Sequence, residues 1–256
     1  MKFENTRVFN FEGALHGMRN PLESWEKSDS DFSDACWERD PALKCEECRH
    51  FAGFGAECAP LIGENDMALA QRLIRGGSEH RKFLRQIFIS VDITAPLYWW
   101  KEFDTYKIGT TANSTSTMHK LASQPITREC FETDDYHPEL IVPAANYPWE
   151  PDFEVGDYVD DHIGFLERLR QKYLETKDKR YWKELVRWLP ESWLQTRTIT
   201  MNYETVSNIV HQRKNHKLNE WSGRDDLANP NFIAWAKSLP YAAEFIFLNE
   251  TERDEQ

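Results

Sequence analysis

The chain has 256 residues, of which 40% are hydrophobic and ten are tryptophan, so it is long enough and apolar enough to fold around a sizeable core. Its 31 basic and 43 acidic residues give a formal net charge of −12. This balance argues against a nonspecific grip on the backbone of a nucleic acid, although a nucleotide needs only a few local cations.

The sequence has neither a long apolar run nor a dense cysteine framework. No stretch of about eighteen apolar residues is present, and the first residues lack the apolar core of a signal peptide. Five cysteines are an odd number, which favours reduced thiols over disulfides. These features predict a cytoplasmic protein.

The first 64 residues are predicted to precede the main domain. Residues 1–35 are polar and rich in turn-forming residues, which is typical of an extended lead-in. A cysteine-bearing segment follows, with one Cys-x2-Cys pair flanked by single cysteines: Cys36, Cys45, Cys48 and Cys58. Four thiolates folded together suit a structural zinc ion, but a single Cys-x2-Cys is half of the usual pattern, so ordinary reduced thiols are the alternative.

The first regular elements are predicted between residues 65 and 107. Asn65 or Asp66 is expected to cap a helix that runs to Ile74 and ends at Gly76-Gly77. A period of two then predicts a strand over Gln86–Thr94, because every second residue from Ile87 to Ile93 is aliphatic. A helix over residues 97–107 begins after Pro96. Its aromatic start, residues 97–103, is interpreted as core packing, with stacking on a ligand as the alternative.

The second half of the chain is predicted to be mainly helical. No internal repeat is found, and the whole pattern predicts a single α+β domain over residues 65–248, followed by an acidic tail at 249–256. The expected elements are helices over 160–176, 180–189 (closed by Pro190) and 203–218, a long proline-rich loop over 138–151, and a last helix capped by Asn229-Pro230 that ends before Pro240.

Arg213 falls on the apolar face of the predicted helix 203–218. At about 100° per residue it lies on the same stripe as Val206 and Ile209. A guanidinium group facing a core must be paired, because its desolvation is otherwise too costly. A buried carboxylate would make a structural ion pair, and a phosphate or carboxylate ligand would make a binding site. The local pattern does not decide between these two.

The segment Thr200–Arg213, TMNYETVSNIVHQR, resembles the C-terminal helix of flavin-dependent thymidylate synthases. Asn202, Asn208 and Arg213 have the spacing of that family's two asparagines and arginine. The resemblance implies that the asparagines contact the flavin, FAD, and that the arginine holds the phosphate of a deoxyuridine nucleotide. Glu204 departs from the pattern, because the family often has an arginine there. Leu189-Pro190 matches a Leu-Pro that precedes the segment.

The other half of that family's site is altered in this chain. Phe88–Pro96 resembles the family's strand, but its Arg-His-Arg triplet falls on Thr105-Tyr106-Lys107, and a later arginine falls on Thr117. Lys107 is then the remaining cation for a phosphate, although a lysine does not reproduce a bidentate fork. Three candidates for substrate binding lie in a hydroxyl-rich run that is either an adapted phosphate loop or a turn: Thr115, Thr117 and His119.

His80 is a second choice for a flavin contact. The family places a histidine near the start of the strand, and Gln86 aligns best with it. The cationic run Glu79–Arg85 around His80 is interpreted as a solvated face.

The resemblance implies a thymidylate-synthase-complementing-protein-like fold, a mixed sheet with packed helices. It also implies a flavin-dependent transferase acting on a pyrimidine nucleotide, with altered active-site chemistry, a folate as a further partner, and a homotetramer. The alternative is a non-catalytic relative that binds a nucleotide or another protein, because motif erosion of this kind is expected there too. A zinc-stabilised nucleic-acid module is disfavoured by the net charge.

Overall fold

The computed structural model describes residues 1–32, 60–143, 152–224 and 229–248. The chain divides into two compact units. We call residues 2–93, 102–113 and 197–256 the α8 unit, and Met1 with residues 94–101 and 114–196 the α6–α7 unit. The α+β class predicted from the sequence is confirmed. The predicted partition at residue 64 stays a prediction.

A four-stranded sheet has the order β1-β2-β6-β3. The strands are β1 (Lys2–Phe9), β2 (Phe88–Pro96), β3 (Thr111–Ser114) and β6 (Leu194–Asn202). Two side-chain bonds join β2 to β6 in antiparallel register, namely Thr94 to Thr196 at 2.7 Å and Thr198 to Asp92 at 2.6 Å. In β2 the alternate residues are buried, as the period of two predicts.

Only β2 was predicted from the sequence, and the lead-in interpretation of residues 1–35 is wrong where the structure describes them. Residues 2–9 form β1, and α1 (Phe11–Arg19) buries Phe11 and Leu15. β1 escapes recognition because only Val8 is buried along it. β6 is rich in threonine and buries just Ile199 and Met201, so its apolar signal is weak.

Helices pack around the sheet residues of the α8 unit. Beyond α1 they are α3 (Glu64–Arg75), α8 (Tyr203–Arg213), α9 (Asn219–Ser222), α10 (Phe232–Lys237) and α11 (Ala242–Phe245), with the 3-10 segments η1 (Asn20–Leu22), η2 (Trp25–Lys27) and η4 (Lys82–Gln86). The helix predicted over 203–218 therefore ends five residues early. The last helix is capped by Asn231, whose side chain accepts the Ala234 amide at 2.8 Å, and not by Asn229.

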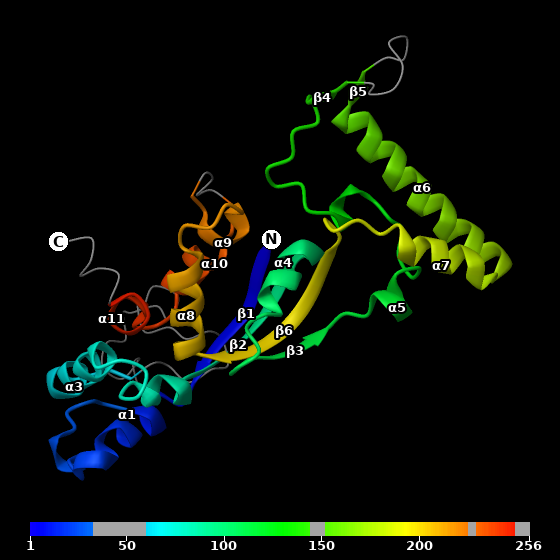
Figure 1. Ribbon diagram of the computed structural model, residues 1–256. Helices are drawn as coiled ribbons and strands as arrows, with labels where there is room; N and C mark the ends of the chain where they lie inside the picture. Colours follow the sequence, from blue (N-terminus) through cyan, green and yellow to red (C-terminus); the bar gives the residue numbers. More distant parts are fainter. Residues whose placement is uncertain (33–59, 144–151, 225–228, 249–256) are drawn as a thin grey trace, which may run out of the picture. The chain divides into compact units, whose positions relative to one another are not determined.

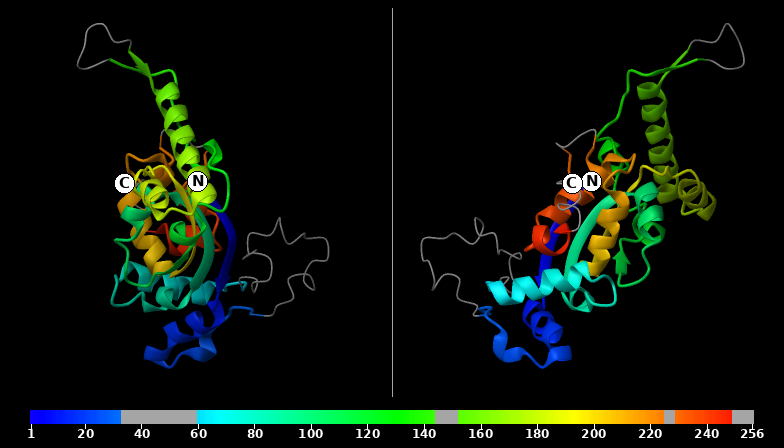
Figure 2. Two further views of the ribbon diagram at one scale, coloured as in Figure 1. Left: turned by 90° about the vertical axis from the view of Figure 1, so that its right-hand side faces the viewer. Right: turned by 60° about the vertical axis from the view of Figure 1, so that its left-hand side comes forward.

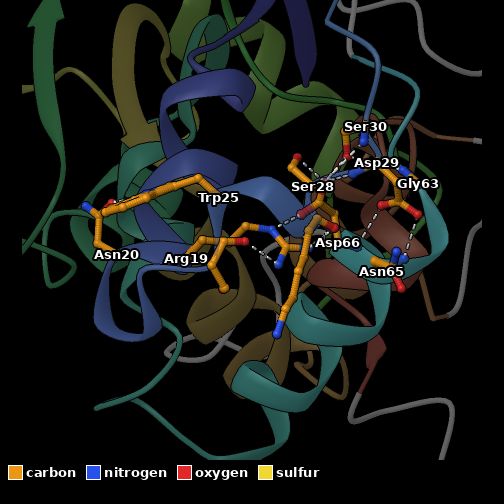
Figure 3. A network of polar contacts seen from close by, with 11 residues as sticks. Arg19, Asn20, Trp25, Ser28, Asp29, Ser30, Gly63, Asn65 and Asp66 are labelled. Atoms are coloured by element: carbon orange, nitrogen blue, oxygen red, sulfur yellow. Dashed lines mark hydrogen bonds and ion pairs between the residues drawn. The ribbon is translucent and has the colours of Figure 1, made fainter.

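The start of α3 differs from the prediction in an informative way. Neither Asn65 nor Asp66 caps it; Gly63 holds the cap position, and the carboxylate of Asp29 accepts the amides of Asn65 and Asp66 at 2.9 and 3.1 Å. Asp66 is buried instead. Its carboxylate accepts Nε of Arg19 at 2.6 Å (Figure 3). The predicted end of the helix is confirmed, because Gly76 is its C-cap.

Asp66 and Arg19 form the centre of a closed network. The second carboxylate oxygen of Asp66 accepts the hydroxyls of Ser28 at 2.7 Å and Ser30 at 2.6 Å (Figure 3). The remaining Arg19 nitrogens donate to the carbonyls of Ser24 and Lys27. Arg19 is 4% exposed and Asp66 is fully buried. The network joins residues 19–30 to the start of α3.

The α6–α7 unit has a helical hairpin and its own core. It holds α5 (Thr117–Lys120), the 3-10 segment η5 (Arg128–Cys130), α6 (Val155–Thr176), α7 (Lys179–Arg187) and most of α4 (Leu97–Phe103), with β4 (Ile141–Val142) paired antiparallel to β5 (Phe153–Glu154). Figure 2 shows α6 and α7 side by side. Leu121, Ile126, Phe131, Leu166 and Leu185 form the core between them.

Two further expectations concern α4 and the membrane. Trp99 and Trp100 are buried and meet edge to face at 4.9 Å, so core packing is confirmed for the aromatic start of this helix.

Among the described residues, no helix combines the length and the apolar character that a membrane span requires.

Candidate functional site

The helix α8 carries the residues that the sequence singled out. Asn202 ends β6 and caps α8, because its Oδ1 accepts the Thr205 amide at 3.0 Å (Figure 1 shows the strand leading into the helix). A Cβ at Gly109, which has φ of +76°, would come within 2.8 Å of the Asn202 Nδ2. The amide oxygen of Asn202 is therefore engaged in the helix cap, and its amide nitrogen is covered by the loop after α4.

Glu204 lies in the first turn of α8 and binds two arginines. Arg81 donates from Nε to Oε1 at 3.1 Å, and Arg85 donates from Nε to Oε2 in a short contact. The Glu204 side chain is 8% exposed, whereas Arg81 is 16% and Arg85 is 48% exposed. Glu204 raises the pKa of Arg85 by its hydrogen bond and its charge. The charge of Glu79 also acts on Arg85, but Glu79 is paired with Lys82. The two guanidinium groups against the Glu204 carboxylate therefore leave a positive balance.

Asn208, one turn further along α8, joins the same cluster. Its Oδ1 accepts Nη2 of Arg81 at 3.0 Å, so the amide nitrogen of Asn208 is left to point elsewhere. His80 precedes Arg81 and is exposed, with its ring packed beside Gly76. The structure therefore brings Asn208 and Arg81 together, and His80 is the residue before Arg81 in the chain. We call Arg81, Arg85, Glu204 and Asn208 the Glu204 cluster.

Arg213 faces inward at the end of α8, as its helical position predicts, and it is 18% exposed. Its Nη1 lies 2.8 Å from Oε2 of Glu102, and its Nε donates to the hydroxyl of Tyr106 at 2.7 Å. The guanidinium also lies 5.0 Å above the ring of Trp221 and 5.6 Å above that of Tyr106. The same carboxylate lies 3.3 Å from Nε2 of His216. Of the two pairings left open by the sequence, this structure contains the ion pair.

Residues 105–107, which the sequence aligned with the Arg-His-Arg triplet, form a loop beside α8. Tyr106 is held by Arg213 and donates to Oε1 of Gln212 at 3.2 Å. Lys107 is exposed, and the next residue, Ile108, is 91% exposed. Thr205 fixes the loop by donating its hydroxyl to the carbonyl of Ile108 at 3.3 Å. Lys107 thus lies in the same compact unit as Arg213, at the solvent-facing tip of the loop.

The remaining candidates lie elsewhere. Thr115, Thr117 and His119 belong to the α6–α7 unit, where the hydroxyl-rich run is the end of β3 followed by α5, capped by Ser116, which accepts the His119 amide at 3.1 Å. Cys36, Cys45, Cys48 and Cys58 lie outside the described residues. Cys130 is a free thiol, and the described part of the chain holds no group of three or more metal-binding side chains.

Sequence reasoning missed the role of Arg81 and Arg85. The run Glu79–Arg85 was interpreted as a solvated face, yet Arg81 is mostly buried against α8, and Phe83 and Leu84 are in the core. The sequence did contain one signal of the contact between these arginines and α8. Glu204 stands where the family that the segment resembles often has an arginine. The first turn of α8 is otherwise buried, and a carboxylate in such a place must be paired. Cations from another element can pair it.

Neither a protein-family model nor a curated protein sequence matches this chain. Solved structures do match, among them a flavin-dependent thymidylate synthase from Helicobacter pylori complexed with FAD and dUMP, and the enzyme from the same organism with FAD and dUMP in a second crystal structure. The first is 16% identical, with a TM-score of 0.58 over 97% of this chain and 99% of that chain. The second is 17% identical, with a TM-score of 0.58 over 97% and 98%.

The fold is therefore that of flavin-dependent thymidylate synthases, as the resemblance of α8 and β2 implies. At this level of identity the match defines the architecture, and the chemistry must be argued from the side chains.

Proposed function

We propose that this protein is a flavin-dependent enzyme that acts on a pyrimidine nucleotide and whose anion-binding charge lies in the Glu204 cluster. The observation that carries the proposal is the positive balance of that cluster on α8, in a fold that resembles structures complexed with FAD and dUMP. Altered active-site chemistry is part of this proposal, and the ion pair of Arg213 with Glu102 supports it.

The described residues fit the anionic part of FAD. A diphosphate needs fixed donors and positive charge, and planar guanidinium groups provide both in a fork that suits phosphate oxygens. Arg85 is half exposed and Arg81 is fixed by Glu204 and Asn208, so the cluster is both accessible and positioned. Asn208 is exposed beside it and offers its amide nitrogen as a further donor.

When bound, a flavin would supply the redox chemistry that side chains lack. The residues of this chain would bind and orient. Arg81 and Arg85 would hold a phosphate, and Asn208 would direct its amide donor to the cofactor, with His80 as an adjacent contact. Asn202 would contact the cofactor if the loop at Gly109, which lies against its amide nitrogen, moves aside. Lys107 and Arg213 would meet the phosphate of the nucleotide, which for Arg213 requires the carboxylate of Glu102 to move.

A non-catalytic nucleotide-binding relative is the second candidate, and the ion pair of Arg213 with Glu102 favours it. A phosphate that displaces Glu102 must overcome a charge-assisted hydrogen bond that is partly shielded from water. Under this candidate the chain binds a nucleotide through the Glu204 cluster and holds no flavin.

The purified full-length protein separates these candidates. Flavin absorbance bands in the visible spectrum, or saturable quenching of added FAD fluorescence, are expected for the flavoprotein. A colourless protein that binds dUMP by calorimetry but not FAD supports the non-catalytic relative. A protein that binds neither would sink both proposals.

Substitutions then test which residues supply the positive charge that binds FAD and the nucleotide. The double variant Arg81→Gln with Arg85→Gln should weaken FAD binding at least about tenfold, because each charge-assisted hydrogen bond is worth about 1.5–3 kcal/mol. Lys82→Gln is the matched control, since it removes one charge beside Arg81 from a 65% exposed side chain. Arg213→Gln tests the nucleotide: an unchanged dUMP affinity assigns Arg213 to structure alone.

A further inference from the structure

The α6–α7 unit contains a cavity that the proposed function does not use. It has a volume of about 550 Å³ and is lined mainly by apolar and aromatic side chains, among them Phe131, Tyr136, Tyr158, Ile163, Trp188 and Leu189. We call it the Tyr136 pocket. Sites for small molecules commonly have about 300–1,000 Å³ and an apolar lining with a few fixed polar groups.

The walls of the Tyr136 pocket are aromatic rings in fixed positions. On α6 the rings of Tyr158 and His162 stack, with centroids 6.3 Å apart and 17° between their planes. Nε2 of His162 lies 3.1 Å from the carbonyl of Trp188. A carbonyl oxygen only accepts, so this nitrogen carries the proton and the ring orientation is set. The indole of Trp188 is held in turn by Glu184, which accepts its N–H at 3.0 Å.

One polar group of the pocket residues makes no hydrogen bond within the described part of the protein. The hydroxyl of Tyr136 is buried and has no hydrogen-bond partner there. Arg128 lies 5.5 Å above the ring of Tyr136 and is itself bound to Asp160, so the phenol is held in place. Buried hydroxyls are nearly always paired, so an unpaired one on a residue that lines a cavity indicates a partner that the described residues do not supply.

We propose that the Tyr136 pocket binds a planar aromatic molecule that presents one carbonyl or carboxylate oxygen to the hydroxyl of Tyr136. The ring walls select a flat apolar body, because aromatic surfaces stack with offset or edge contacts. The unpaired phenol selects an acceptor, because a purely apolar ligand would leave that donor unsatisfied. Tyr158 and Trp188 are 65% and 52% exposed, and a bound ring would cover both.

This site is separate from the Glu204 cluster in composition. Every lining residue of the Tyr136 pocket belongs to the α6–α7 unit, whereas Arg81, Arg85, Glu204 and Asn208 belong to the α8 unit. The proposal therefore does not rest on the proposed function.

The test uses 2-naphthoate, a flat aromatic carboxylate, titrated into the full-length protein and followed by calorimetry and by ligand-observed NMR. Saturable binding with a dissociation constant of about 1 mM or below is expected for a ligand of this size. Tyr136→Phe removes only the hydroxyl and should weaken binding about tenfold. Tyr173→Phe, the same change at a position of α6 outside the pocket, should leave the affinity unchanged.

Two further variants test the shape of the pocket. Val159→Trp fills it and should abolish binding, with thermal unfolding as the check that the variant folds. Tyr158→Ala removes an exposed wall with little risk to folding and should weaken binding at least threefold. Excess FAD or dUMP should not displace naphthoate.

Four outcomes overturn the proposal. These are no saturable binding, equal affinity in wild type and Tyr136→Phe, displacement by dUMP, or a change of oligomeric state in Val159→Trp without naphthoate binding to the wild type. The last would assign the pocket to contact with a second copy.

Discussion

Two carboxylates of the α8 unit, Asp66 and Glu204, bind arginines, but the two sites differ in net charge and in exposure to solvent. Asp66 meets one arginine, and every bond that the two groups make stays inside the protein. Glu204 meets two arginines, one of them half exposed. The first site is neutral and closed, whereas the second keeps a positive charge in reach of solvent. Charge count and exposure, more than the presence of an arginine, distinguish a structural pair from a place where an anion can bind.

Arg213 shows that an inward-facing arginine is not enough. It has a single carboxylate partner in Glu102 and two aromatic rings against its guanidinium, so it resembles the Asp66 site in charge and the Glu204 cluster in exposure. The three sites form a series from closed to open.

Removing the closed carboxylate should have the largest effect. Asp66→Ala leaves the 4% exposed Arg19 without a counter-charge, and we expect a loss of about 3–5 kcal/mol in the free energy of unfolding. Urea denaturation measures it. Glu79→Ala, at an 83% exposed carboxylate paired with Lys82, should change stability by less than about 0.5 kcal/mol. A loss below about 1 kcal/mol for Asp66→Ala would remove the distinction between the two sites.

The largely buried pair of Glu167 and Arg170 in the α6–α7 unit should also be structural, and the pH dependence of stability should show its contribution. Hydrogen bonds from Arg170 above all, and also from the Ile126 amide and Gln171, lower the pKa of Glu167 to about 2, against the opposing effect of its burial. Between this value and its ordinary pKa of 4.5 the unfolded chain binds more protons, so stability should rise with pH across that window and fall as pH drops through about 2.

Glu167→Gln should flatten this pH dependence and lower stability near pH 7 by at most about 3–4 kcal/mol, since the pKa is lowered from 4.5 to about 2 and one pKa unit corresponds to about 1.4 kcal/mol. Thermal unfolding between pH 2 and 7 gives the profile. An acid transition that is the same in the variant and the wild type would assign it to other carboxylates.

Neutralising the open carboxylate should change binding more than stability. In Glu204→Gln the amide oxygen still accepts from the arginines, so the loss of stability should be about 1–2 kcal/mol. The two guanidinium groups then lack their counter-charge, and the affinity for pyrophosphate should rise at low salt. Asp66→Asn should create no such affinity, because its arginine is enclosed. Calorimetry with pyrophosphate would contradict the comparison if both variants, or neither, gained affinity.

Replacing residues 33–59 should have the smallest effect on the rest of the fold. Asp31 and Leu61 exchange both backbone hydrogen bonds, at 2.9 and 3.0 Å, so the chain is already closed at this point. The hydroxyl of Tyr241 adds bonds to Ile62 and Pro60. A Gly/Ser linker of about four residues should therefore change the free energy of unfolding by less than about 1 kcal/mol. A large loss would show that residues 33–59 contribute to the core.

How much of the fold the sequence predicted depended on the strength of its periodic patterns. The strand over 86–94 and the helices over 160–176 and 180–189 were found because their apolar residues recur regularly, and their ends shifted by a few residues. β1 and β6 were missed because few of their residues are buried. The cap of α3 was assigned to its own residues, whereas Asp29 supplies it from thirty-six positions away.

The sequence is enough to predict that α8 follows Asn202 and turns Arg213 inward, because a helix of fixed period places those residues without reference to the rest of the chain. Which charges meet depends on the tertiary structure. Glu102, Arg81 and Arg85 come to α8 from segments about one hundred residues or more away in the chain, and no local pattern encodes such contacts. Whether an arginine is neutralised or left to bind depends on these long-range partners.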